Sequence, residues 1–260
     1  SMGVSGEYGL NMPIVIFTKT DLSGAATLED AAALVTANNK VTVHYQAQIH
    51  GNEPAAGEAA LVTIGRLDTA YGDDLLENIN IYVIPRMNPD GSKDYTRAVP
   101  AGFNANRDML LLQTKEVQQH HYVYNLFMPE VSIDSHEYTV DNTNNNTAYK
   151  DMMVACGYNG NSGEAIIDFS ENIAFNKIRP ALTENGLEFS FYTNVVNNKY
   201  SVSGAVYSGL RGSVSFLLES RGIGFGNHTM ARRVSAHLVA LDSIFAYIND
   251  NPEAVQAASD

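Results

Sequence analysis

Residues 41–71 read VTVHYQAQIHGNEPAAGEAALVTIGRLDTAY. The first nine of them are rich in β-branched and aromatic side chains with partial alternation, which predicts a strand over 41–49. Pro54 then opens a helix predicted over 54–71, because proline is favoured in the first turn of a helix. His50 and Glu53 stand between the two elements in the pattern His-x-x-Glu. This passage therefore predicts that an imidazole and a carboxylate are presented together at the carboxyl end of a strand.

Two later strands end in residues of the same chemical types. The predicted strand 131–135 is followed by His136, and the predicted strand 214–218 is followed by Glu219. Ligands of mostly parallel sheets bind beyond the carboxyl ends of the strands, so these positions are expected to lie together. Two imidazoles and one carboxylate suit zinc in a site that leaves one position open for water. One strand end could supply the third ligand and the other a free carboxylate.

The order of the remaining elements indicates the fold class. Strands alternate with helices, which predicts a mostly parallel sheet covered by helices on both faces. The length of 260 residues suits one large α/β domain. The segments 92–108 and 194–212 are expected to be loops. Further strands are predicted over 13–19, 79–85 and 187–193, and further helices over 27–38, 114–127, 162–185 and 228–249.

Composition and missing motifs exclude several other functions. The chain has 29 acidic against 16 basic residues and a net charge of −13, which argues against nucleic acid as a partner. No apolar stretch approaches the roughly 20 residues needed to cross a bilayer, so no membrane span is expected. The chain has no G-x-x-x-x-G-K-[ST] loop and no G-x-S-x-G elbow, which argues against P-loop nucleotide hydrolysis and serine hydrolysis. Its single cysteine, Cys156, excludes an intrachain disulfide.

A metal-dependent hydrolase needs two further groups. The first is a general base near the water, and Glu219 is the candidate. The second is a fixed cation for the charge that develops on the carbonyl oxygen, which Arg97 or Arg107 could provide. Each residue also has a purely structural interpretation, such as a core histidine at 136 or a Glu219–Arg221 ion pair. The conjunction of all of them favours the metal site.

Several short motifs, in this order along the chain, resemble the zinc carboxypeptidase family typified by carboxypeptidase A. Each motif is weak alone, and their shared order is specific. They are His50-x-x-Glu53, Asn88-Pro89-Asp90-Gly91, Arg97, Asn104-Ala105-Asn106-Arg107, His136 with Tyr138, and Leu217-Leu218-Glu219-Ser220-Arg221-Gly222.

The resemblance implies a fold, a cofactor and a reaction. The fold is a three-layer α/β/α sandwich with a mostly parallel, mixed central sheet, formed by residues 1–260 as a single catalytic domain. The cofactor is one Zn²⁺ ion held by His50, Glu53 and His136. Glu219 acts as general base and Arg97 stabilises the oxyanion, while Asn106 and Arg107 hold the free C-terminal carboxylate of a peptide substrate. A secreted or periplasmic location is expected rather than a cytoplasmic one.

The sequence also departs from the family pattern. Asn104 stands where better-known members have an aspartate that orients a zinc-bound histidine, so metal affinity or ligand basicity is expected to differ. Tyr207, with Tyr200 as the alternative, is expected to be the mobile substrate-binding tyrosine. Arg211 is expected to face the specificity pocket and to favour an acidic side chain. The family usually has a further helix and strand before Pro13, so either a trimmed N-terminus or a minimal variant is expected.

Two other functions remain open at the level of sequence. One is a zinc-dependent N-acyl amino acid deacylase resembling the aspartoacylase and succinylglutamate desuccinylase group, which also carries His-Gly-x-Glu sequences. The Asn88–Gly91 loop and the Asn106–Arg107 pair favour the peptidase over it. The other is a catalytically inactive binding module on the same scaffold, which would require the loss of a metal ligand or of the base.

Overall fold

The structure, a computed structural model, describes residues 1–139, 150–157, 159–192, 203–224 and 226–259. Its strands are β1 (Gly3–Val4), β2 (Asn11–Met12), β3 (Val15–Phe17), β4 (Val41–Ala47), β5 (Ile79–Ile84), β6 (Val131–Thr139), β7 (Met152–Cys156), β8 (Phe189–Phe191) and β9 (Val214–Ile223). Seven of them form a central sheet in the order β3-β5-β4-β6-β9-β7-β8. The β3–β5 and β7–β9 pairs are antiparallel and the other pairs are parallel. The predicted mostly parallel, mixed sheet is therefore confirmed.

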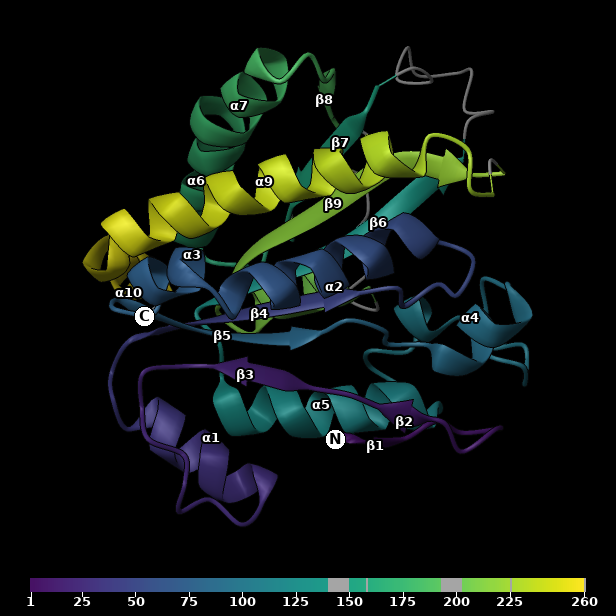
Figure 1. Cartoon of the computed structure of the whole chain (residues 1–260), viewed down its shortest axis with the longest axis horizontal. Helices are drawn as coiled ribbons and strands as arrows, with labels where there is room; N and C mark the ends of the chain where they lie inside the picture. Colours follow the sequence, from purple (N-terminus) through teal and green to yellow (C-terminus); the bar gives the residue numbers. More distant parts are fainter. Residues whose placement is uncertain (140–149, 158, 193–202, 225, 260) are drawn as a thin grey trace.

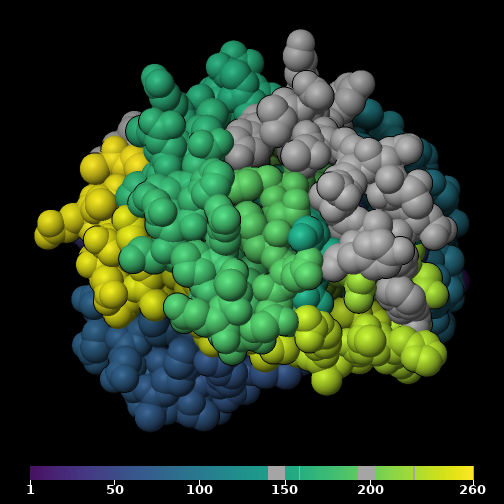
Figure 2. Space-filling view, turned by 90° about the horizontal axis from the view of Figure 1, so that it is seen from above, coloured from purple at the N-terminus to yellow at the C-terminus, as the bar shows by residue number. Residues whose placement is uncertain are grey.

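Helices cover both faces of this sheet. They are α1 (Leu28–Thr36), α2 (Pro54–Leu67), α3 (Ala70–Leu75), α4 (Pro89–Asp94), α5 (Lys115–Phe127), α6 (Glu164–Ile173), α7 (Arg179–Glu184), α8 (Gly204–Leu210), α9 (Met230–Asp250) and α10 (Pro252–Ser259). Figure 1 shows α2 and α9 on one side of the sheet and α5 on the other, which confirms the three-layer arrangement. In the space-filling view, the green layer that contains α6 and α7 packs against the yellow C-terminal helices (Figure 2). Within the described ranges, no helix is both long and apolar enough to cross a membrane.

The two faces of the sheet differ in polarity because successive side chains of a strand point to opposite sides. Val43 and Tyr45 of β4 belong to an apolar core shared with α2 and α9. His44, between them in sequence, instead contacts α5, where its ring lies 5.1 Å from that of His120 and 5.6 Å from that of Tyr124. The same alternation continues on β6 and β9, so on these three strands one face is apolar and the other carries polar side chains. Beside β5, the second face also has an apolar cluster, which packs against α5.

The local structure differs from the predicted elements in four places. The helix expected over 54–71 ends at Leu67, and α3 follows with Thr69 as its N-cap. The segment 92–108 contains the end of α4 and a short 3₁₀ helix, Ala105–Arg107. No strand was expected where β7 lies, and the segment 194–212, expected to be a loop, contains α8. All but the last residue of α8 is buried, so packing stabilises a helix despite its two glycines.

Candidate metal centre and active site

The loop that carries His50 and Glu53 is held between β4 and α4. The backbone N–H groups of Met87 and Asn88 donate to the carbonyls of Ala47 and Gln48, at 3.0 and 3.1 Å. Gly51 packs so closely on α4 that a Cβ atom there would lie 1.9 Å from the carbonyl carbon of Gly91. The His-x-x-Glu loop and the Asn88–Gly91 motif therefore form one unit, and glycine is required at their contact.

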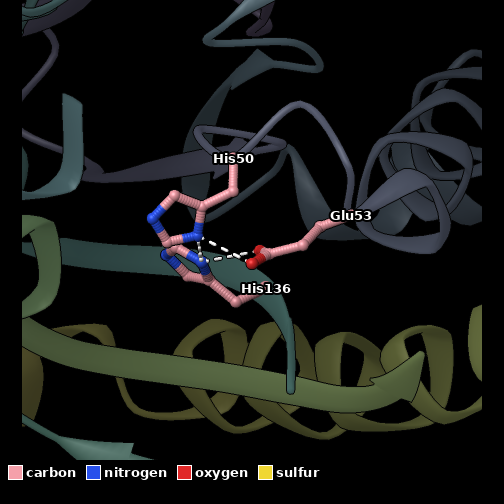
Figure 3. Close-up of side chains that lie close together, drawn as sticks. All are labelled: His50, Glu53 and His136. Carbon is pink, nitrogen blue, oxygen red and sulfur yellow. Dashed lines mark hydrogen bonds and ion pairs between the residues drawn. The ribbon is translucent and has the colours of Figure 1, made fainter. Parts of the chain in front are cut away.

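His50, Glu53 and His136 converge at the carboxyl ends of β4 and β6 (Figure 3). Nδ1 of His50 lies 2.7 Å from Oε1 of Glu53, and Nδ1 of His136 lies 2.9 Å from Oε2 of the same carboxylate. The two Nδ1 atoms are 3.1 Å apart. All three side chains are buried, and one donor atom from each lies within 4.8 Å of the others.

The electrostatics of this group suit a cation. Burial raises the pKa of Glu53, but the neighbouring His50 and His136 outweigh it and hold the pKa well below the usual range of a glutamate. Burial lowers the pKa of His136, but the carboxylates of Asp134 and Glu53 outweigh it and raise that pKa well above the usual value. Two imidazoles and one ionised carboxylate form a donor set that fits zinc. These three residues could bind a metal ion, as the sequence predicted.

A cavity of about 550 Å³ opens beside the three candidate ligands. It brings together every predicted catalytic residue and the predicted carboxylate-binding pair. Its described lining consists of His50, Asn52, Glu53, Arg97, Asn106, Arg107, Asp134, His136, Glu137, Tyr138, Thr139, Tyr192, Ser203, Ala205, Val206, Leu217, Glu219 and Ile223.

Glu219 occupies β9 directly beside the candidate metal ligands. Its register partner on the neighbouring parallel strand β6 is His136. Burial raises the pKa of the Glu219 carboxyl to about 7, against the lowering effect of the His136 charge. A cation held by His50, Glu53 and His136 would lower this pKa further. Glu219 is therefore suited to accept a proton at neutral pH.

The cationic and amide side chains enter from the loop that follows α4. Arg97 lies at the cavity mouth with Nη1 3.2 Å from Oε1 of Glu53, and its side chain is 45% exposed. Nη1 of Arg107 donates to the carbonyl of Asn106 at 2.6 Å. The side-chain Oδ1 of Asn106 accepts a hydrogen bond from the backbone N–H of Gly204 at 2.7 Å. These residues line one side of the cavity within reach of a bound carboxylate.

Tyr207 and Arg211 do not line this cavity. Tyr207 belongs to α8 and its hydroxyl contacts Nδ1 of His121 on α5 at 3.3 Å. Arg211 donates to the Tyr207 hydroxyl at 2.7 Å and to Oδ1 of Asn125 at 2.9 Å. The expectation of a pocket lined by these two residues rested on a loop over 194–212, whereas α8 turns both side chains toward α5. The alternative, Tyr200, lies outside the described residues.

Several cavity residues are not among the predicted site residues, and Tyr192 and Asp134 are two of them. Tyr192 directly follows β8, and the negative charge of Glu219, with burial, raises its pKa to about 12, so its phenol is neutral at pH 7. Asp134 precedes His136 by two residues on β6 and is 1% exposed. A signal for each was present, since Tyr192 lies near the end of a predicted strand and Asp134 is a charged residue within an apolar run.

A family model described as zinc carboxypeptidase matches residues 8–152, more than half of the chain. The chain belongs to the zinc carboxypeptidase family. Carboxypeptidase 2 of Trichophyton rubrum is 29% identical over 266 residues, covering 96% of this chain and 48% of the relative. Carboxypeptidase 2 of Trichophyton tonsurans is 29% identical over 233 residues, covering 82% of this chain and 43% of the relative. The chain thus spans about half the length of the curated relatives it matches.

Solved structures share the fold of this family member. A metallo-carboxypeptidase from Burkholderia cenocepacia has a TM-score of 0.68 at 18% identity, covering 95% of this chain and 64% of that chain. A metallo-carboxypeptidase from Pseudomonas aeruginosa, in complex with (2-guanidinoethylmercapto)succinic acid, has a TM-score of 0.70 at 17% identity, covering 95% of this chain and 63% of that chain. The predicted family and fold are both confirmed.

Proposed function

We propose that this chain is a zinc-dependent carboxypeptidase that hydrolyses the C-terminal peptide bond of peptides with a free carboxylate. One observation carries the proposal: the three candidate metal ligands, Glu219, Arg97 and the Asn106–Arg107 pair line one cavity. These residues are spread from position 50 to position 219, so only the fold brings them together. Family membership supports the same activity.

His50, Glu53 and His136 would hold one zinc ion through Nδ1 of each imidazole and the carboxylate oxygens. When bound, zinc supplies Lewis-acid activation of water and of the scissile carbonyl. Glu219 takes the proton of the attacking water and later gives it to the leaving amine. Arg97, whose guanidinium already lies at the metal ligands, stabilises the negative charge that develops on the carbonyl oxygen.

Asn106 and Arg107 select the end of the substrate. A guanidinium pairs with a carboxylate through two parallel hydrogen bonds. The C-terminal amide of an amidated peptide cannot accept both of these bonds. Both residues lie on the cavity wall next to each other, and Arg107 is exposed toward solvent at its mouth. A free C-terminus held there would place the last peptide bond near Glu219 and the metal ligands.

The direct test is hydrolysis of paired peptides that are identical except for a free or an amidated C-terminus. Zinc-loaded protein is expected to release the last residue from the free-acid member of each pair only. An N-acyl amino acid panel run beside the peptides tests the deacylase hypothesis. Turnover confined to that panel would replace the proposal, and zinc binding without turnover on either panel would favour an inactive binding module.

A further inference from the structure

Each candidate metal-binding imidazole has a second nitrogen on the side away from the metal centre. Both histidines turn Nδ1 toward Glu53, so both place Nε2 behind the centre. Nε2 of His50 lies 3.1 Å from the amide oxygen of Asn104, which is neutral. Nε2 of His136 lies 3.0 Å from Oδ1 of Asp134, which is a carboxylate. The two histidines therefore differ in the charge of the group behind them.

Asp134 is placed behind His136 by the geometry of β6. Residues two apart on a strand project from the same face, so Asp134 and His136 lie side by side. The carboxylate is almost fully buried, and neither of its oxygens receives a hydrogen bond from the described residues. A buried carboxylate without a cationic or donor partner is costly, and among the described residues His136 is the only ion-pair partner of Asp134.

Asn106 also approaches Nε2 of His136 but cannot serve as its acceptor. Its Oδ1 accepts from the backbone N–H of Gly204, so the atom 3.2 Å from Nε2 is the amide nitrogen Nδ2, a donor. An imidazole that coordinates a metal through Nδ1 carries its proton on Nε2 and needs an acceptor there. Oδ1 of Asp134, 3.0 Å from Nε2, is the carboxylate oxygen placed to accept that hydrogen bond when the imidazole holds a metal.

We propose that Asp134 is a positioning residue of the metal centre, which orients His136 and supplies the carboxylate charge that Asn104 lacks. The proposal rests on the metal site of the proposed function. The amide of Asn104 still orients His50, but it adds no charge to it. Asp134 raises the basicity of His136 instead, so the charged partner stands behind a different histidine.

The start of α8 fixes the Asp134 side chain in place. A Cβ atom at position 204 would lie 2.7 Å from Oδ2 of Asp134 and 2.9 Å from Nε2 of Gln46. Gln46 is also the register partner of Asp134 on β4. Gly204 therefore lets the backbone close over the carboxylate, which excludes water and strengthens its interaction with His136.

The test compares zinc affinity, measured by chelator competition, in matched variants. Asp134→Asn removes the charge at nearly constant shape, and we expect zinc binding to weaken by about 10- to 100-fold. Asn104→Ala removes a neutral acceptor, which His50 shares with the backbone N–H of Asn106, and we expect a loss below about tenfold. Asp151→Asn, at a buried carboxylate that pairs with Arg232 outside the cavity lining, is the control and should leave affinity unchanged.

A second substitution separates positioning from mere structural support. Asn104→Asp places a carboxylate behind His50, and in the Asp134→Asn background it should recover at least tenfold of the lost affinity. When Co²⁺ binding is followed by its absorption spectrum, the affinities of the variants for Co²⁺ should rank in the same order as their affinities for zinc. An Asp134→Asn protein that binds zinc within threefold of the parent would overturn the proposal, and so would a loss that Asn104→Asp does not reduce.

Should Asp134→Asn fail to fold, the unmodified protein still provides a test. In zinc-loaded protein, NMR of the imidazole nitrogens should find His136 protonated at Nε2, with a strongly deshielded proton that exchanges slowly with solvent. Coordination of zinc through Nε2 of His136 would refute the proposal. None of these measurements depends on peptide hydrolysis, so a zinc-binding protein without carboxypeptidase activity would defeat the proposed function and leave this inference standing.

Discussion

The two faces of the central sheet are built from the same strands but differ in what they contribute. Toward α2 and α9, β6 and β9 present Val131, Ile133, Phe216 and Leu218, all fully buried in one apolar core. The opposite face carries the polar residues of these strands and of β4, which are His44, Gln46, Ser132, Asp134, His136 and Glu219. Burying polar groups costs free energy unless they are paired, so along β4, β6 and β9 the apolar face stabilises the fold while the other face supplies the polar groups of the cavity. Beside β5, the second face has an apolar cluster of its own against α5.

One buried ion pair interrupts the apolar face. Glu137 points toward α9, where Arg233 donates to its Oε2 through Nε at 2.9 Å. Oε1 of Glu137 accepts from the backbone N–H of Ala55 at 2.6 Å, and its own backbone N–H donates to Oε2 of Glu53 at 3.1 Å. A Cβ at position 222 would overlap Oε2 of Glu137 at 1.4 Å, so Gly222 is required. This pair connects the apolar face to the candidate metal ligand Glu53.

The largest effect is expected from Glu219→Gln on the polar face. The variant keeps the shape of the side chain but cannot accept a proton, so peptide hydrolysis should fall by at least about 10³-fold. Zinc content and melting temperature should remain those of the parent, because the residue is not a metal ligand. Near-normal turnover in the zinc-loaded variant would remove Glu219 from the role of base.

A matched pair on β9 tests the two faces directly. Phe216→Ala empties a buried site on the apolar face and should lower the free energy of unfolding by about 3–5 kcal/mol. Its neighbour Ser215→Ala, on the polar face, loses one hydrogen bond to the carbonyl of Ala205 and should cost about 1–3 kcal/mol. Denaturant titration of both variants measures the free energy of unfolding. Equal decreases in the two variants would contradict a larger contribution of the apolar face to stability.

Arg107→Ala is expected to change selectivity more than turnover. Without the guanidinium, the preference for free-acid over amidated peptides should fall by about 10- to 100-fold, since a hydrogen bond to a charged group contributes about 1.5–3 kcal/mol. The ratio of kcat/KM values for each peptide pair measures this preference. Lys115→Ala, at an exposed position outside the cavity lining, serves as a control for the loss of a positive charge. An unchanged ratio would exclude Arg107 from carboxylate binding.

A pH dependence is expected from α5, where it packs against the polar side chains of the sheet. Burial, with the charge of His121, lowers the pKa of His120 from 6.5 to about 3, and both of its ring nitrogens lack a described hydrogen-bond partner. Between these values the unfolded chain binds a proton that the folded protein does not. His120 therefore contributes a loss of stability as the pH falls from 6.5 to 3, with a slope of up to about 1.4 kcal/mol per pH unit.

His120→Leu removes this titration at similar volume. The unfolding free energy of the variant, measured by denaturant titration across pH 3–7, should decline less steeply on acidification than that of the parent. The difference in slope should correspond to the uptake of about one proton on unfolding. The difference between the two proteins isolates His120 from the other groups that titrate in this range. Parallel curves would show that the ring is protonated or solvated in the folded state.

The order of strands and helices could be predicted from the sequence, and so could the convergence of the candidate metal ligands and the candidate base on one cavity. His50 and Glu53 lie between a strand and a proline-initiated helix, and His136 and Glu219 extend apolar strands, so local patterns identify them. Parallel strands then bring these positions to one sheet edge, whatever the details of packing. The family could be predicted for the same reason, because its motifs are short and local.

Only the tertiary structure shows which way a side chain points, and the roles of some residues depend on that direction rather than on their position in the sequence. The helix α8 forms because its side chains are buried against β6 and β9, and it turns Tyr207 and Arg211 away from the cavity. The Asp134–His136 pair likewise required knowing which face of β6 lies against α8 and which nitrogen of His136 is turned inward. Local sequence specifies the spacing of side chains along the backbone, whereas side-chain direction follows from packing between distant segments.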